Sequence, residues 1–185
     1  MRAKFTHKRL AEICVSGGVS THRVGVVNPQ LETYAEALLT HASYHGVAMV
    51  EFRYDEQSGR AWLLEVNPRF WGSVGLAIQS GVDFPYLLFR MADEGDIEPV
   101  LRYRSGVIVK WLLGDAVRLA RQVLDSQSRK TQWIRTSGCH GYDDFFWDDP
   151  LVFPAEVLLS VRKGLRTARR PAPDLDVSME GGEGG

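Results

Sequence analysis

The chain has 185 residues, of which 44% are hydrophobic and 24% charged, a composition typical of a globular domain with a sizeable core. A formal net charge of −1 does not indicate a nucleic-acid or membrane-surface partner, and no apolar run approaches the length of a membrane span. The N-terminus lacks the apolar core of a signal peptide, and Cys14 and Cys139 are not spaced as a metal or redox motif, so we expect a cytoplasmic protein with free thiols.

The first predicted elements are a strand of mixed polarity over residues 5–14 and a Gly-rich turn over 16–20. The turn is either a plain loop or a loop that borders the pocket for an acceptor substrate. In the second case Thr21, His22 and Arg23 would face that pocket. We interpret His22 as a solvated loop histidine rather than as a catalytic base.

A helix is predicted to begin at Asn28 and Pro29, because asparagine is a good N-cap and proline suits the first helical position. Apolar residues then recur at helical spacing, and Gly46 is expected to end the helix, which should pack on the strand that follows. His41 and His45 lie four residues apart near this end. Such a pair can bind zinc, but we interpret both as terminal histidines that the helix dipole favours.

An antiparallel hairpin is predicted next, with apolar strands over residues 47–52 and 62–66 joined by the polar loop 55–59. Each strand carries one carboxylate, Glu51 in the first and Glu65 in the second. If Tyr54 pairs with Arg60, Glu51 opposes Leu63 and lies diagonal to Glu65, at about 7–8 Å.

These two carboxylates are the main candidates for a functional site. Glu51 and Glu65 would share one face of the hairpin with Asn67, because side chains alternate along a strand. A carboxylate in an apolar strand is costly unless it is paired or bound to a metal, and a set of oxygen ligands suits Mg²⁺ bridging phosphates. The alternative is a surface hairpin whose outer face carries ordinary glutamates.

Beyond the hairpin, helices are predicted over residues 73–80, from the cap Asp83 onward, and over 115–124, with a strand over 103–113. In the second helix Tyr86, Leu87, Leu88 and Met91 should point inward, and Trp71 should lie in the core.

The C-terminal third contains a polar linker over 126–130 and a terminal helix over 151–169. Between them, the Asp-rich and aromatic segment 143–150 is expected to be an aromatic-anchored loop rather than a Ca²⁺ loop, because its spacing does not fit an EF-hand. From residue 171 on, Pro, Asp and Gly predict disorder.

The segment from Glu51 to Arg69 resembles the metal-binding signature of the ATP-grasp superfamily, in which one glutamate precedes Glu65-Val66-Asn67-Pro68-Arg69 by fourteen positions. Further segments are similar to the carbamoyl-phosphate-synthase-like and carboxylate–amine ligase branch; these are His7-Lys8-Arg9, the 16–21 loop, Phe70-Trp71-Gly72-Ser73 and Gly81-Val82-Asp83-Phe84-Pro85. The resemblance covers roughly residues 5 to 115.

This resemblance implies roles for four residues. Glu51 and Glu65 would bind one or two Mg²⁺ (or Mn²⁺) ions on the β- and γ-phosphates of ATP, and Asn67 would complete the set. Arg69 would steady the transferred phosphoryl group, because its planar, permanently charged guanidinium matches phosphate. The implied reaction is the ATP-dependent activation of a small carboxylate substrate for attack by an amine.

The resemblance is to the C-terminal lobe of such an enzyme, so the expected fold is α+β, a mainly antiparallel sheet with flanking helices. We expect a partial ATP-grasp domain over residues 1–125, a helical extension over 126–170 and a disordered tail over 171–185. The sequence contains no Gly-rich loop followed by Lys of the kind that the first lobe supplies. The alternative function is therefore a non-catalytic lobe or remnant that completes a partner subunit carrying the missing nucleotide-binding lobe.

Overall fold

The computed structural model describes residues 1–12, 19–124 and 138–168. Four sequence-based predictions fall outside these ranges: Cys14, the Gly17-Gly18 loop, the linker 126–130 and the tail from residue 171. Within them the fold is α+β with mainly antiparallel strands and flanking helices, which confirms the predicted fold class. No helix in the described part of the chain is long and apolar enough to cross a membrane.

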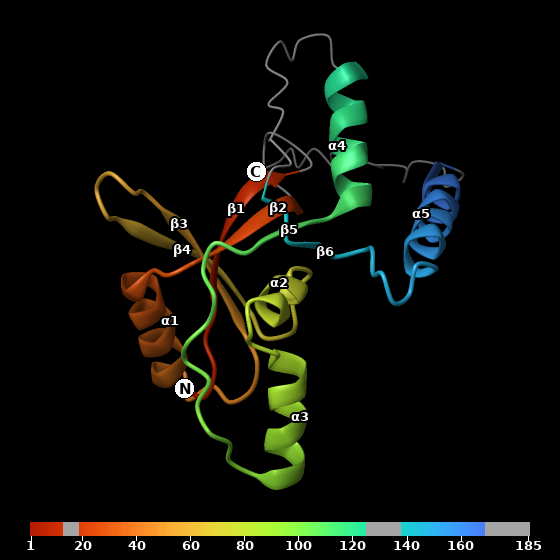
Figure 1. The fold of residues 1–185 in the computed structure, drawn as a ribbon. Coiled ribbons are helices and arrows are strands. Elements are labelled where there is room, and N and C mark those ends of the chain that lie inside the picture. The colour runs from red at the N-terminus through yellow and green to blue at the C-terminus, as the bar shows by residue number, and fades with distance from the viewer. Residues whose placement is uncertain (13–18, 125–137, 169–185) are drawn as a thin grey trace, which may run out of the picture.

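The larger sheet has four strands in the order β1-β2-β5-β6 (Figure 1). They are β1 (Thr6–Glu12), β2 (Ser20–Val26), β5 (Ile108–Lys110) and β6 (Gly141–Tyr142). The pairs β1–β2 and β2–β5 are antiparallel, whereas β5 and β6 run parallel. The prediction of one strand over residues 103–113 is therefore wrong in extent, since only three of these residues form β5.

The strand β5 is short because a helix begins immediately after it. Asp144 accepts hydrogen bonds from the backbone N–H groups of Leu112 at 3.0 Å and Leu113 at 2.8 Å. Such a side chain satisfies donors that a helix start leaves without partners. Helix α4 (Leu112–Leu124) therefore starts three residues earlier than the sequence pattern predicted.

The segment 143–150 is held mainly by its first two aspartates. Asp143 pairs with Arg23 of β2, and the Asp144 side chain is almost fully buried. Phe145 stacks edge-on with Trp147, but Trp147 itself is 86% exposed. Phe145 is half-buried and packs edge-on against Tyr142 of β6, so one of the three rings anchors the segment as predicted, and the hydrogen bonds of the two carboxylates were not foreseen.

The smaller sheet is the hairpin of β3 (Met49–Tyr54) and β4 (Ala61–Asn67), whose tip projects away from the larger sheet in Figure 1. Tyr54 pairs with Ala61, not with Arg60 as predicted. The Asp55 N–H bonds to the Arg60 carbonyl at 2.9 Å, and Gly59 takes a positive φ of 67° inside the turn. The loop therefore comprises the six residues 55–60 and closes one position later than the predicted register requires.

Helix α1 (Pro29–His41) packs beside this hairpin. The Asn28 side chain accepts from the Leu31 N–H at 3.1 Å, which confirms the predicted cap. The helix ends at the cap Ala42, so the predicted end at Gly46 is wrong. The Tyr34 ring lies 6.5 Å from the ring of Phe52 in β3, so the helix contacts the strand that carries Glu51, as expected.

The Asn28 cap should make a measurable contribution to stability. Replacing Asn28 with Ala leaves the Leu31 N–H without its acceptor and should lower the free energy of unfolding by about 1 kcal/mol. Urea unfolding followed by circular dichroism would measure this difference. Asn28→Ser, which keeps a capping oxygen, should lose much less, and equal losses in both variants would show that the cap has no role.

Two further helices follow the hairpin, α2 (Val74–Gln79) and α3 (Phe84–Glu94). Trp71 is buried and packs edge-on against Phe84 at 5.2 Å, which confirms its predicted place in the core. Asp83 caps α3 as predicted, through a bond from the Tyr86 N–H. Three of the four predicted inward residues of α3 are half-buried, but Tyr86 is 55% exposed, so that prediction is wrong.

The core lies between α2 and the larger sheet. Leu76 and Val109 are fully buried, Val107 is nearly so, and Phe5 packs against them.

The last helix, α5 (Val152–Ala168), corresponds to the predicted terminal helix. The indole of Trp111, the residue before α4, donates a hydrogen bond to Glu156 of α5 at 3.2 Å. Cys139 is a free, half-buried thiol.

Candidate functional site

The two candidate carboxylates lie directly opposite each other in the hairpin. Glu51 of β3 is the pairing partner of Glu65 of β4. Directly opposed residues of an antiparallel pair point to the same face, with Cβ atoms about 4.5–5.5 Å apart. The two side chains are therefore closer neighbours than the diagonal arrangement that the sequence suggested.

A β-bulge produces this pairing. The register runs evenly from Tyr54 to the Phe52–Leu63 pair and then shifts by one residue, so that Leu64 is left between two pairs. Without the shift, Glu51 would oppose Leu64 and Glu65 would point to the other face, because side chains alternate along a strand. The bulge thus brings both carboxylates to one face, as bulges near functional sites often re-aim side chains.

Asn67 lies on the same side of β4 and contacts one of the carboxylates. Its amide nitrogen donates to Glu65 Oε1 at 2.5 Å, and its pairing partner is Met49. Because the amide nitrogen is engaged with Glu65, the amide oxygen is the group that Asn67 can offer to a cation. The structure therefore brings together three of the four residues predicted for the site.

A basic residue from the larger sheet reaches this cluster. Arg9 of β1 donates to Glu51 Oε2 at 2.5 Å and to Glu12 Oε1 at 3.3 Å. Burial raises the pKa of Glu51, the charge of Arg9 lowers it, and the negative charges of Glu65 and Glu12 raise it again. The net direction is upward, chiefly because burial disfavours the charged form of the carboxyl group.

The fourth predicted residue lies apart from the carboxylates. Arg69 follows β4 and is exposed, and its guanidinium donates to the neighbouring Phe70 carbonyl at 3.1 Å. In the described part of the chain no ion pair joins Arg69 to Glu51 or Glu65. The predicted place of Arg69 next to the phosphoryl group would require its side chain to turn toward Glu51 and Glu65.

The hairpin is more open than its apolar strands suggested. Glu65 is exposed, the Glu51 side chain is 20% exposed, and the large apolar residues of β4 are 38–57% exposed; these are Trp62, Leu63, Leu64 and Val66. Within residues 1–12, 19–124 and 138–168 no group of three or more His, Cys, Asp or Glu side chains is arranged to hold a metal ion. The cluster thus offers two carboxylates and one amide, a set that leaves coordination positions for ligands from outside the chain.

The residues predicted to face an acceptor pocket are buried in the larger sheet instead. Thr21, His22 and Arg23 belong to β2 and are 0–3% exposed. The interpretation of His22 as a solvated loop histidine is therefore wrong, because β2 continues through it and both faces of the strand are covered. His7 of β1 is half-buried, and desolvation together with the charges of Arg23 and Arg9 lowers its pKa to about 4.

Some charged residues of the sheet were not identified from the sequence as candidates. Arg9 was noted only as part of a similar segment, and Lys110 only as part of a predicted strand. A signal existed for Lys110, because it stands in the apolar run from Val107 to Trp111. A charged residue inside an apolar run is unusual, because charged side chains are rarely buried unless they are paired.

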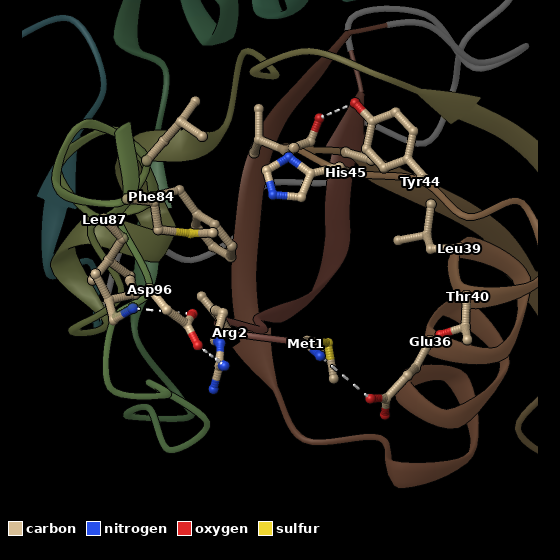
Figure 2. A pocket seen from close by; sticks show the side chains of 17 residues that line it. Met1, Arg2, Glu36, Leu39, Thr40, Tyr44, His45, Phe84, Leu87 and Asp96 are labelled. Carbon is tan, nitrogen blue, oxygen red and sulfur yellow. Dashed lines mark hydrogen bonds and ion pairs between the residues drawn. The ribbon is translucent and has the colours of Figure 1, made fainter. Parts of the chain in front are cut away.

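A separate pocket of about 420 Å³ lies between the N-terminal segment, the end of α1 and helix α3 (Figure 2). The Met1 amino group pairs with Glu36 at 3.9 Å across one side, and Arg2 pairs with Asp96 on another. His45 lines this pocket, whereas none of the four predicted site residues does. The pocket and the carboxylate pair are therefore different features of the molecule.

Comparison with known proteins gives one match. A family model described as "ATP-grasp in the biosynthetic pathway with Ter operon" matches residues 15–114, which include Glu51, Glu65, Asn67 and Arg69. No curated protein and no solved structure was found to match the chain.

Proposed function

The chain belongs to the ATP-grasp family of the biosynthetic pathway with the Ter operon, and from this premise we propose that it is the ATP- and Mg²⁺-binding part of a cytoplasmic ligase that activates a small carboxylate. The observation that supports this most directly is the pairing of Glu51 with Glu65. Two carboxylates on one sheet face repel each other unless a cation lies between them.

The donors present fit a hard divalent cation. Glu51, Glu65 and the Asn67 amide offer only oxygen ligands, which Mg²⁺ and Mn²⁺ prefer, and Mg²⁺ typically takes its remaining ligands from water and substrate phosphates. Arg9 also contributes positive charge at Glu51. We infer that Glu51 and Glu65 hold the ion and that Arg9 neutralises the remaining charge of the cluster. Such an ion would neutralise charge on the phosphates of ATP.

The proposed reaction has two displacements. A carboxylate oxygen of the substrate attacks the γ-phosphorus of ATP, and the bond to the bridging oxygen breaks, which yields an acyl-phosphate and ADP. The amine nitrogen then attacks the acyl carbon, phosphate leaves, and the nitrogen loses a proton. Arg69, after turning from the Phe70 carbonyl, would steady the transferred phosphoryl group, since its fork matches phosphate oxygens.

A second candidate function has its own supporting observation. The apolar side chains of β4, from Trp62 to Val66, are 38–57% exposed beside the carboxylates. Exposed apolar surface of this kind often marks a contact with another polypeptide. We propose that a polypeptide supplying the Gly-rich phosphate loop and its Lys covers this strand, so that the chain acts by completing a two-lobed site.

Metal binding tests the proposed site directly. Titration with Mn²⁺ alone would be followed by electron paramagnetic resonance. The Mn²⁺ affinity should be at least about tenfold lower in both Glu51→Gln and Glu65→Gln than in the wild-type chain, because even residues that only orient a metal ligand contribute this much. Because burial raises the pKa of Glu51, protons should compete with the ion at a higher pH than they would at an ordinary glutamate, and the affinity should fall as the pH is lowered toward that pKa.

Glu56→Gln is the matched control, because Glu56 lies on the same hairpin, is exposed and pairs with Lys8. Its Mn²⁺ affinity should equal that of the wild-type chain. If the Glu51 and Glu65 variants bind Mn²⁺ as well as this control does, the carboxylate pair is not a metal site.

A further inference from the structure

A second cluster of charged groups lies inside the larger sheet, away from the carboxylate pair. His22 of β2 pairs directly with Lys110 of β5, so the two side chains share one face of the sheet. His22 is 1% exposed and Lys110 is 2% exposed. The Lys110 Nζ and the His22 Nε2 are both buried without a hydrogen-bond partner within the described structure.

The neighbouring carboxylate is already engaged by another cation. Asp115 of α4 accepts a hydrogen bond from Arg118 Nε at 2.9 Å and lies 2.7 Å from Arg118 Nη2. The two residues are three positions apart, on neighbouring positions of one helix face. The same Asp115 oxygen lies 3.6 Å from His22 Nδ1, beyond a normal hydrogen bond. Asp115 therefore does not balance the positive charge of Lys110, although α4 and β5 both contact β2.

The carboxylates of segment 143–150 are also committed elsewhere. Asp143 pairs with Arg23, which follows His22 along β2 and so points to the opposite face of the sheet. Asp144 accepts the two backbone N–H groups at the start of α4. Neither carboxylate forms an ion pair with Lys110 in the described part of the chain.

The contacts of the His22 ring bear on which of its two nitrogens carries a proton. Burial, the largest influence, lowers the pKa of His22, so the ring is neutral at pH 7. Its Nδ1 lies 3.1 Å from the Thr21 hydroxyl. When this hydroxyl donates to Nδ1, the ring proton resides on Nε2, since a neutral imidazole carries only one. An ammonium and an N–H donor are then left unpaired on the same face.

We propose that His22 and Lys110 form a binding site for a small oxyanion, namely a phosphate or carboxylate group. A buried ammonium without a counter-charge is strongly unfavourable, and an oxyanion between the two nitrogens would supply both the charge and the acceptors. The near-complete burial of both residues restricts the ligand to a small ion or group.

This site is independent of the proposed metal centre. Arg9, which contacts Glu51, pairs with Arg23, and Arg23 points to the sheet face opposite His22. Binding at His22 and Lys110 should therefore need no divalent cation, and a failure of the metal proposal would leave it unaffected.

Calorimetry with inorganic phosphate, and separately with acetate, tests the site on the full chain in buffer that contains EDTA and constant ionic strength. One saturable site per chain is expected, and the anion that binds identifies the chemistry of the ligand. In Lys110→Met the affinity should fall at least about tenfold, the loss expected when a charge-assisted bond is removed. Lys8→Met is the control, because Lys8 is an exposed lysine paired with Glu56, and it should bind like the wild-type chain.

Thermal unfolding gives a second measurement on the same proteins. The bound anion should raise the unfolding temperature of the wild-type chain but not that of Lys110→Met, because ligands stabilise only the state that binds them. Should Lys110→Met fail to fold, His22→Leu takes its place and must also bind the anion at least about tenfold more weakly, since it loses the Nε2 donor. Absence of saturable binding of both anions, or unchanged affinity in these variants, would overturn the proposal.

Discussion

Glu65→Gln should lower ATP-dependent ligation by at least about 100-fold when the chain is assayed together with a polypeptide that supplies the Gly-rich phosphate loop and its Lys. The substitution removes one of the two paired carboxylates, and with it the charge that we propose holds the cation on the phosphates. Arg69→Ala should produce a loss of similar size, because it removes a charge that we place on the transferred phosphoryl group. Turnover would be measured as ADP release at saturating ATP.

The 185-residue chain assayed alone should release no ADP above background, since it carries no Gly-rich loop followed by Lys. Glu56→Gln, at the exposed end of the same hairpin, serves as the control and should keep full activity with the added polypeptide. Turnover by the chain alone that disappears in Glu65→Gln would contradict the two-lobe proposal and would make this chain a ligase by itself.

Leu76→Ala should lower the free energy of unfolding by about 2–5 kcal/mol, the range for truncating a fully buried leucine. Leu76 is 0% exposed and forms the centre of the core with Val107 and Val109, of which Val109 lies in β5, the strand that carries Lys110, and Val107 immediately precedes it. Its removal leaves a cavity that the short helix α2 and the three-residue strand β5 can only partly close. Chemical denaturation followed by tryptophan fluorescence would measure the loss.

Ile78→Ala is the matched control for this prediction. Ile78 lies two residues away on the same helix but is 41% exposed, so its truncation should cost less than about 1 kcal/mol. Equal losses at Leu76 and Ile78 would mean that α2 is not packed on the sheet as described.

The features that the sequence determined by itself are local ones. The cap at Asn28, the cap at Asp83 and the hairpin around 55–59 were all predicted, because each depends on residues within a few positions of one another. The fold class and the family were implied by the resemblance of the segment from Glu51 to Arg69 to the ATP-grasp signature, which lies within one hairpin and its immediate continuation.

The tertiary structure decided the features that depend on distant residues. The start of α4 at Leu112 is set by Asp144, which lies 32 residues further along the chain. The burial of His22 depends on its pairing with Lys110, which no local pattern could show. The exposure of β4 likewise depends on which elements cover it, not on its apolar composition.

The position of the carboxylate pair depends both on the local sequence and on the folded structure. The sequence determined that Glu51 and Glu65 stand on neighbouring strands of one hairpin, and we expected them to share a face through a regular register. The structure places them on one face by a different route, because the turn closes one residue later and a bulge at Leu64 restores the alignment. Alternation of side chains is a property of a single strand, whereas register is a property of two strands and of the turn between them, so only the folded hairpin could decide it.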